Sequence, residues 1–510
     1  MNLKGIKTWL PSELRKQDFV SSSLVDLYTK QGFEEISIPS LVDLQVISKT
    51  NSKFSNEIFK LVDKDGKVLA LRTEMTQPIA RLVASRASEL EFPLKLFYDS
   101  SIFRYKGVAT DDSREIRQVG IEHIGDAESD LETVKLVLDS VKQLAIKNYR
   151  LSITDAGIWR AIIDKYPDIG ARLHDMVLAG DLISFKKHIF ADHPLLALLT
   201  SDVDALEASL GLDLSGIRDL LKMDDAIVFD PLQCPDLNLY TGLHFNLHVE
   251  GQGKLLARGG RYDNLLKEFG KDLPAIGFAF YLPRLMSVMA DQCLLPGQNK
   301  KNITNNKVLK IALSKGTLLQ GALDFLKTQG LLAEITNKRK LVLDAGPGLG
   351  FDKVELLLVR GHDVPTYVEH GAADLGVVGL DTVIDSNASL VKLKDLDYGH
   401  CKLCVCAKNG LYQSVADLPN YARVATTFPN LTNAFFAQKG LEVEVINLYG
   451  SVELGPLTEL SDVIVDLVAT GATLKENGLE IIEEIMPCSA VLVANNSSFK
   501  VYKNEFLNLS

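Results

Sequence analysis

The hydrophobic positions of the chain follow two different patterns, one in each half. In the first half, KLFYDSSIFRY (95–105), IRQVGIEHIG (116–125) and LYTGLHFNLHVEG (239–251) are long runs typical of strands. No regular helical pattern alternates with them, which favours a mostly antiparallel sheet. Between residues 155 and 222 the apolar residues recur at helical spacing instead, as in ISFKKHIF and GIRDLLK. That stretch predicts a helical insertion.

Short apolar strands alternate with helical patterns in the second half, which indicates an α/β domain with parallel sheets. The strand-like segments are LKIAL, AADLGVVG, CKLCVCA, RVATT, EVEVINL and SDVIVDLV. Residues 296–307, PGQNKKNITNNK, are rich in Asn and Lys and contain almost nothing apolar, as in a linker. We therefore expect a first domain at 1–295, a linker at 296–307 and a second domain at 308–510.

Composition narrows the class of protein. The chain has 510 residues, of which 46% are hydrophobic and 24% charged, values typical of globular domains with large cores. The net charge of −11 argues against a non-specific nucleic-acid binder. Six cysteines do not make a disulfide framework, and no apolar run has the length of a signal peptide or a membrane span. We expect a cytoplasmic protein that does not contact a membrane.

The clearest chemical motif is DVIVDLVATGATL (462–474), an apolar strand that ends in a Thr-Gly-Ala-Thr turn before a helix-compatible segment. Such a turn offers backbone N–H groups and two hydroxyls to a phosphate, and Gly471 lets the backbone approach the anion. The alternative is a plain strand–helix turn. Nearby carboxylates would bind sugar hydroxyls, although each alone fits a solvated charge at a strand end. The candidate sugar-phosphate site comprises Glu453, Asp462, Asp466, Thr470, Gly471, Ala472, Thr473 and Leu474.

From about residue 308 to 500 these motifs occur in the order seen in a known family. IALSKGTL (311–318), LLLVRGHDVPTYVEHGAADLGVVGLD (356–381) and the VATGATL turn resemble the short-form catalytic subunit of ATP phosphoribosyltransferase. The resemblance implies a two-lobed fold like that of periplasmic binding proteins. It also implies the first step of histidine biosynthesis, in which N1 of ATP attacks the anomeric carbon of phosphoribosyl pyrophosphate and pyrophosphate leaves.

The same resemblance implies which charged groups assist the reaction. Lys315, Arg339 and Arg360 would be the catalytic cations that neutralise the leaving pyrophosphate. Mg²⁺ is expected to arrive with the substrate, and we assign it no protein ligand. In this chain Ala469 precedes Thr470, where the family often has a polar or acidic residue. The ribose is therefore left to Asp466, Asp462 or Glu453.

Three cysteines near His400 invite comparison with a zinc site. On a strand, Cys404 and Cys406 share one face and Cys401 points to the other, and no second CxxC cluster completes a set of ligands. We interpret the cysteines as small side chains of a core strand.

Motifs of the first half, over about residues 4–290, resemble the catalytic domain of histidyl-tRNA synthetase, a class II synthetase. They are LRTEMT (71–76), REIRQVGIEHIG (114–125), LYTG (239–242), RGGRYDNLL (258–266) and GFAFYLPRL (277–285). The resemblance implies an antiparallel α+β domain with a histidine pocket. Its residues would be Glu74, Thr76, Gln118, Glu122 and Tyr240.

One departure separates the chain from a working synthetase. Pro235 stands where that family has the arginine that stabilises the reacting carboxylate, and a transferase-like half follows in place of an anticodon-binding domain. This pattern resembles the regulatory subunit of ATP phosphoribosyltransferase, here fused to the catalytic part. We expect histidine feedback, no tRNA partner and a homo-oligomer. The alternatives are a histidine sensor with an inactive transferase-like domain and, less in keeping with Pro235, a divergent synthetase.

Overall fold

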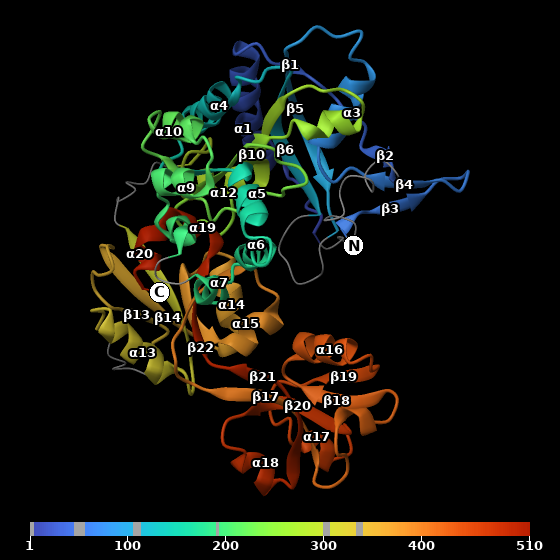
Figure 1. The fold of residues 1–510 in the computed structure, drawn as a ribbon, viewed down its shortest axis with the longest axis vertical. Helices are drawn as coiled ribbons and strands as arrows, with labels where there is room; N and C mark the ends of the chain where they lie inside the picture. The colour runs from blue at the N-terminus through green and yellow to red at the C-terminus, as the bar shows by residue number, and fades with distance from the viewer. Residues whose placement is uncertain are drawn as a thin grey trace. The chain divides into compact units, whose positions relative to one another are not determined.

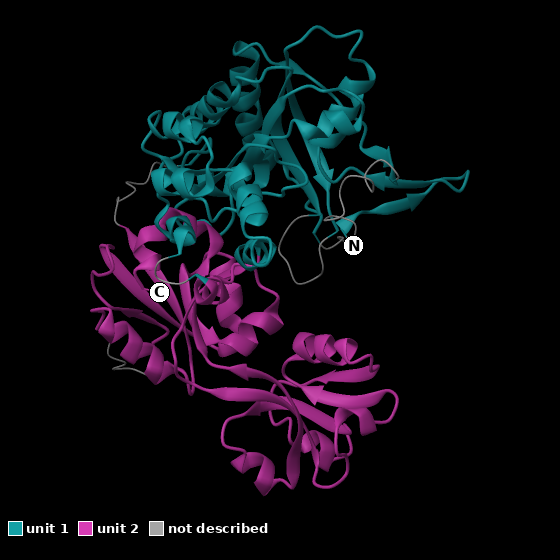
Figure 2. Ribbon diagram, in the orientation of Figure 1, with its two compact units in different colours: residues 1–178, 189–304 teal, residues 179–188, 305–510 magenta. Residues whose placement is uncertain are grey.

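The computed structural model describes residues 5–44, 57–105, 114–189, 193–298, 307–332 and 340–509. The chain forms two compact units, coloured separately in Figure 2. Unit 1 comprises residues 1–178 and 189–304, and unit 2 comprises residues 179–188 and 305–510. Most of the predicted linker lies outside the described residues.

Unit 1 is built on an eight-stranded sheet with the order β1-β5-β6-β11-β10-β9-β7-β8 (Figure 1). The six inner strands are antiparallel, and only the short end strands β1 (Glu34–Glu35) and β8 (Ile227–Phe229) pair in parallel. This confirms the antiparallel sheet expected from the sequence. The inner strands are β5 (Leu94–Phe103), β6 (Glu115–Ile124), β11 (Ala275–Tyr281), β10 (Ala257–Arg261), β9 (Leu243–Val249) and β7 (Tyr149–Asp155).

Helices pack against both faces of this sheet. On one face α1 (Pro11–Lys30) contacts α4 (Asp130–Gln143) and α12 (Leu282–Asp291), which in turn pack on β11 and β6. On the other face, the apolar side of α3 (Thr76–Ser85) joins a core cluster with α11 (Asn264–Glu268). A separate three-stranded sheet contains β2 (Leu41–Asp43), β4 (Val68–Leu71) and β3 (Lys60–Val62).

The predicted helical insertion lies between β7 and β8. Its helices are α5 (Ala156–Lys165), α6 (Gly170–Leu178), α7 (Leu182–His188), α8 (Ala197–Thr200), α9 (Val203–Leu210) and α10 (Ser215–Leu221). Asp155 caps α5, because its carboxylate accepts the N–H of Gly157 at 2.7 Å.

Unit 2 has two lobes, each with its own sheet. The first sheet has the order β13-β14-β12-β15-β22-β16, with β13 at Val342–Asp344, and the second has the order β19-β18-β20-β17-β21. Each sheet contains three parallel strands, as the sequence pattern predicted. They form the centre of the first sheet, with β12 (Val308–Ser314), β14 (Lys353–Val359) and β15 (Leu375–Gly379), and one side of the second, with β18 (Ala422–Thr426), β19 (Val443–Asn447) and β20 (Val463–Val468).

Both sheets also contain antiparallel strands, so they are mixed and not wholly parallel. The chain passes from the first lobe to the second between β16 (Leu390–Asp395) and β17 (Cys401–Lys408). It returns between β21 (Leu479–Cys488) and β22 (Ala490–Asn495). Strands β17, β21 and β22 pair antiparallel because they carry the chain across and back. The lobes also meet where Asp385 accepts the N–H of Leu431 at 2.9 Å.

The segment at residues 179–188 comes from the helical insertion but belongs to unit 2, whereas the sequence analysis placed it in the first domain. It lies against edge strand β16. The N–H of Lys392 donates to the carbonyl of Gly180 at 2.7 Å, and Lys392 Nζ donates to Asp181 Oδ2 at 2.9 Å. Ile183 packs against a core cluster of the first lobe. The segment therefore covers part of a sheet edge.

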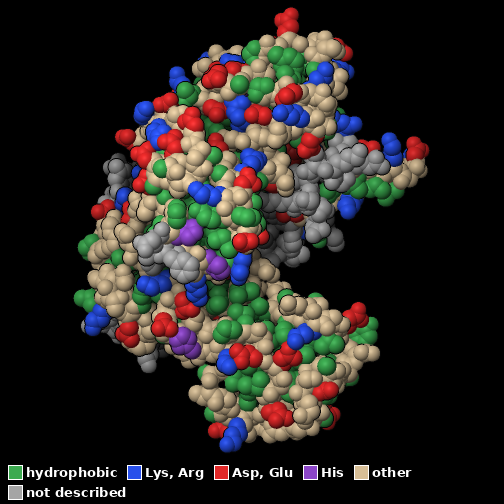
Figure 3. Space-filling view, viewed as in Figure 1, with side chains coloured by type: hydrophobic (Ala, Val, Ile, Leu, Met, Phe, Trp, Pro, Cys, Tyr) green, Lys and Arg blue, Asp and Glu red, His purple; other side chains and the backbone are tan. Residues whose placement is uncertain are grey.

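Acidic and basic side chains are interspersed over the face of the molecule shown in Figure 3. On the described residues of that face we see no broad patch of one charge. Within the described ranges, no helix combines the length and apolar character needed to cross a membrane.

The attachment of residues 179–188 can be tested at Gly180. A Cβ there would overlap the carbonyl oxygen of Leu390, and its φ is +65°. Gly410 has a similar φ of +72° but open space around it. Both Ala variants incur the left-handed backbone cost of about 1–2 kcal/mol. We expect Gly180→Ala to lower the calorimetric unfolding midpoint of unit 2 clearly more than Gly410→Ala. Equal shifts would contradict this packing.

Candidate functional site

The first candidate site is a pocket over the sheet of unit 1, with a cavity of about 160 Å³. The floor of this pocket has room only for glycine at two positions. A Cβ at Gly277 would overlap the carboxylate of Glu122, its cross-strand partner, and a Cβ at Gly260 would lie 2.7 Å from the ring of Tyr240. Glycine at these two positions lets both side chains lie flat across neighbouring strands.

Glu122 is the most enclosed acidic group of the site, with 1% of its surface exposed. Thr76 Oγ1 donates to Glu122 Oε1 at 2.8 Å, and the Tyr262 hydroxyl donates to Oε2. Burial raises the pKa of Glu122 to about 8 despite these donors. Burial likewise raises the pKa of Glu74 to about 7, although the N–H of Gln77 donates to it. Near pH 7 the Glu122 carboxyl group is therefore mostly protonated, whereas that of Glu74 is balanced between the neutral and charged forms.

The structure brings the five predicted histidine-binding residues together. Glu74, Thr76, Gln118 and Tyr240 line the pocket, and Glu122 lies behind Thr76 and Tyr262. Burial raises the pKa of Tyr240 above its usual range, so the phenol stays neutral. Tyr262 and Arg258, both from the motif RGGRYDNLL, also line the pocket but were not among the residues expected from the sequence. Their place in that motif was the sequence signal by which these two pocket residues could have been found.

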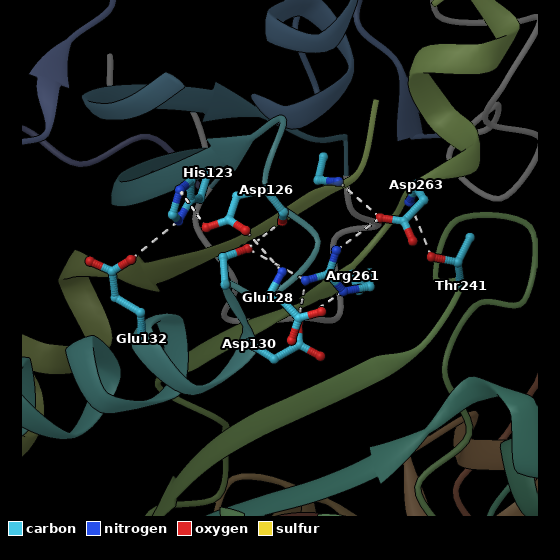
Figure 4. A network of polar contacts seen from close by, with 10 residues as sticks. His123, Asp126, Glu128, Asp130, Glu132, Thr241, Arg261 and Asp263 are labelled. Carbon is cyan, nitrogen blue, oxygen red and sulfur yellow. Dashed lines mark hydrogen bonds and ion pairs between the residues drawn. The ribbon is translucent and has the colours of Figure 1, made fainter. Parts of the chain in front are cut away.

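A polar network fixes the loop that carries Tyr240 (Figure 4). Arg261 is 8% exposed and donates from Nε to Asp130 at 2.8 Å and from a terminal nitrogen to Asp263 at 3.2 Å. The N–H of Asp263 donates to the hydroxyl of Thr241 at 3.0 Å, and the N–H of Thr241 donates to the carbonyl of Arg261 at 2.7 Å. These bonds tie the end of β10 to the residue after Tyr240.

The same network includes a buried histidine. His123 lies 3.7 Å from carboxylate oxygens of both Asp126 and Glu132 (Figure 4). Burial nevertheless lowers the pKa of His123, so the neutral ring is favoured at pH 7.

The second candidate site lies at the carboxyl ends of parallel strands in the first lobe of unit 2. Lys315 follows β12 and Arg360 follows β14, strands that pair in register up to Ser314 and Val359. The N–H of Lys315 donates to the carbonyl of Val359 at 2.9 Å, so the two cations leave adjacent strand ends side by side. Ligands of open α/β sheets bind at such edges. Arg339, the third predicted cation, lies outside the described residues.

The predicted phosphate turn joins β20 to the short helix α18 (Ala472–Glu476) in the second lobe. Gly471 has a φ of +73°, and a Cβ there would meet only Val468 at 3.9 Å. The glycine is therefore required by its left-handed backbone more than by close packing. Thr470, Ala472 and Thr473 are exposed at the turn, and Leu474 is buried below it.

The three predicted ribose carboxylates do not lie together. Burial, with the nearby charge of Glu453, raises the pKa of Asp466 to about 6, which places these two acids as electrostatic neighbours. Asp462 instead precedes β20, at the end opposite the turn. There it forms an ion pair with Arg423 at 3.0 Å and accepts that residue's N–H at 2.8 Å. The structure thus leaves Asp466 on the strand that leads to the turn and gives Asp462 a structural partner.

The three cysteines of β17 occupy the core as interpreted from the sequence. Cys404 and Cys406 pack in one cluster, and Cys401 contacts a cluster on the other face of the sheet. Among the described residues we find no group of His, Cys, Asp or Glu arranged to hold a metal ion.

Comparisons with known proteins agree with this division. A family model described as ATP phosphoribosyltransferase matches residues 360–510, and one described as histidyl-tRNA synthetase matches residues 5–285. The ATP phosphoribosyltransferase of Halothermothrix orenii is 44% identical over 203 residues, which are 39% of this chain and 89% of that protein. The enzyme of Thermosynechococcus vestitus is 44% identical over 202 residues, covering 39% of this chain and 93% of its own.

A solved structure described as an ATP phosphoribosyltransferase regulatory subunit/histidyl-tRNA synthetase from Bacillus halodurans aligns with a TM-score of 0.52 and 23% identity. The alignment covers 65% of this chain and 90% of that one, and it supports the fold alone.

Fold and sites together define a two-part protein, a class II synthetase-like domain followed by a two-lobed α/β transferase domain. The chain belongs to the ATP phosphoribosyltransferase family, and residues 5–285 belong to the histidyl-tRNA synthetase family.

The raised pKa of Glu122 predicts how stability depends on pH. The folded protein holds this proton up to about pH 8, whereas the unfolded chain releases it near the usual pKa of 4.5. The folded state therefore binds more protons in this window, and stability falls as pH rises from about 5 to 8. We expect Glu122→Gln to flatten that decline, measured by denaturant unfolding of unit 1 at several pH values. An unchanged slope would mean that Glu122 ionises normally.

Proposed function

We propose that this chain catalyses the first step of histidine biosynthesis and that its first unit controls the reaction by binding histidine. In the reaction, N1 of the ATP adenine displaces pyrophosphate from the anomeric carbon of phosphoribosyl pyrophosphate. The observation that carries the proposal is the family match of unit 2 combined with two cations at adjacent strand ends. The relatives that share this half are themselves ATP phosphoribosyltransferases.

The groups of unit 2 suit a reaction that depends on positioning and charge. The backbone N–H groups of residues 470–474 would bind the 5′-phosphate, and the carboxylates of Asp466 and Glu453 would accept the ribose hydroxyls. Lys315 and Arg360 would stabilise the charge that develops on pyrophosphate, with Arg339 as a further cation.

Mg²⁺ is proposed to arrive bound to the pyrophosphate, where it would neutralise negative charge on the leaving group. No protein ligand is assigned to this ion, which oxygen atoms of the substrate would hold. We further propose a cytoplasmic homo-oligomer that does not act on tRNA.

A single assay tests the catalytic proposal. The full chain, mixed with ATP, phosphoribosyl pyrophosphate and Mg²⁺, should change ultraviolet absorbance as phosphoribosyl-ATP forms. Arg360→Ala should lower kcat roughly ten- to a hundredfold, because one charged contact contributes about 1.5–3 kcal/mol. A folded parent protein without turnover would favour the alternative of a sensor with an inactive transferase domain.

Two aspartates on the same strand provide a matched comparison. Asp466→Asn removes a carboxylate beside the turn, so we expect kcat/KM for phosphoribosyl pyrophosphate to fall about tenfold or more. Asp462→Asn weakens only the ion pair with Arg423 and should leave that constant close to the parent value. Initial-rate kinetics decide the matter, and equal losses would place both acids in the site.

Histidine control is proposed from the buried acids of unit 1. The ligand's ammonium group favours ionised carboxylates, and burial holds the pKa values of Glu74 and Glu122 at about 7 and 8. Inhibition requires histidine to bind the less active state more tightly, a coupling of about 1–3 kcal/mol.

We therefore expect histidine affinity to rise between about pH 6.5 and 8, because the acids then need to release fewer protons on binding. Glu122→Gln should weaken both binding and inhibition, measured by calorimetry and by inhibition curves. Glu128→Gln, the same change at an exposed position, serves as the control. Histidine inhibition that persists unchanged in Glu122→Gln would place the effector elsewhere.

A further inference from the structure

One arginine that lines the unit 1 pocket, Arg258, has no role assigned so far. Arg258 lies in β10, where the sheet register pairs it with Ala279 of β11 and Asn246 of β9. Gly260, two residues further along the strand, faces the pocket, so Arg258 points to the same side. Its side chain lines the pocket together with Tyr240.

Arg258 differs from the neighbouring arginines in its partners. Burial raises the pKa of Glu74, and the charge of Arg104 offsets part of that rise. Arg104 Nε also donates to the carbonyl of Thr73 at 2.9 Å. Arg261 is paired with Asp130. Arg258 donates from Nε to the amide oxygen of Asn246 at 3.0 Å, and within the described ranges it forms no ion pair with a carboxylate.

The hydrogen bond to Asn246 orients the guanidinium of Arg258 but does not neutralise its charge. Asn246 is itself buried in β9, and a neutral amide leaves the positive charge of Arg258 uncompensated. The cross-strand neighbour Ala279 has only a methyl side chain, which leaves room above the sheet. A planar guanidinium held in this way suits two parallel hydrogen bonds to a carboxylate.

We infer that Arg258 is the residue that binds the carboxylate of a zwitterionic α-amino acid in this pocket. The inference rests on the proposed binding of histidine, whose ammonium group would meet Glu74 at the acidic side of the cavity, with Glu122 behind Thr76. Pro235, where the synthetase family has an arginine, supplies no charge for this carboxylate, and Arg258 would supply it instead. The cation for the ligand's carboxylate thus comes from the sheet floor and not from the loop before Tyr240.

The test compares two ligands and two variants of the full-length chain by calorimetry. Histidine carries a carboxylate, and histidinamide replaces it with a neutral amide. Arg258→Gln keeps a polar side chain but removes the charge, and we expect it to weaken histidine binding about ten- to a hundredfold. Histidinamide should bind the parent and Arg258→Gln equally. The control is Arg150→Gln, because Arg150 is an exposed arginine of the same sheet, and this variant should bind both ligands like the parent.

Each other outcome overturns the inference in a recognisable way. If Arg258→Gln binds histidine like the parent, Arg258 does not hold the carboxylate, although the proposed function of the pocket survives. Equal losses for histidine and histidinamide would give Arg258 a merely structural role. A parent protein that binds neither amino-acid ligand would overturn the proposed histidine control as well.

Discussion

Burying an ionisable carboxyl group over an antiparallel sheet is the constraint on which the architecture of unit 1 depends. Glu122 is satisfied by a hydroxyl from the first turn of α3 and a phenol from the end of β10, and its carboxylate fits only because Gly277 lies opposite. Leaving such a group without partners would cost several kcal/mol. One side chain therefore fixes the relative positions of a helix, a strand end and the sheet floor.

Charge pairing around Arg261 extends this arrangement to the rim of the pocket. The arginine is neutralised by Asp130 and Asp263, and the backbone bonds between Thr241 and the end of β10 hold the loop of Tyr240. Arg258, three residues earlier, is oriented by a neutral amide and remains charged. Neighbouring arginines of one motif thus serve opposite purposes, one stabilising the scaffold and the other presenting charge to a ligand.

In unit 2 the ends of parallel strands position the candidate groups. Its cations and its phosphate turn occur where parallel strands end, because backbone groups and side chains converge at those edges. The segment at residues 179–188 belongs to the same unit, although the chain reaches it from the insertion of the first half. Its hydrogen bonds to β16 protect a sheet edge that would otherwise be open to pairing. A segment from the first half of the chain thereby becomes part of unit 2.

The sequence by itself determined the two domain classes, the antiparallel and α/β sheets, and the histidine-pocket candidates of unit 1 that the structure brings together. Period-two and helical patterns are local, and motifs such as LRTEMT, RGGRYD and TGATL keep their order along the chain, so both can be recognised without a structure. Only the tertiary structure separated Asp462 from Asp466, since the pairing of Asp462 with Arg423 depends on which strands lie side by side in the sheet. Likewise, only cross-strand register placed Arg258 on the pocket floor, and only long-range packing assigned residues 179–188 to unit 2. These features arise from contacts between segments far apart in sequence, for which local patterns carry no information.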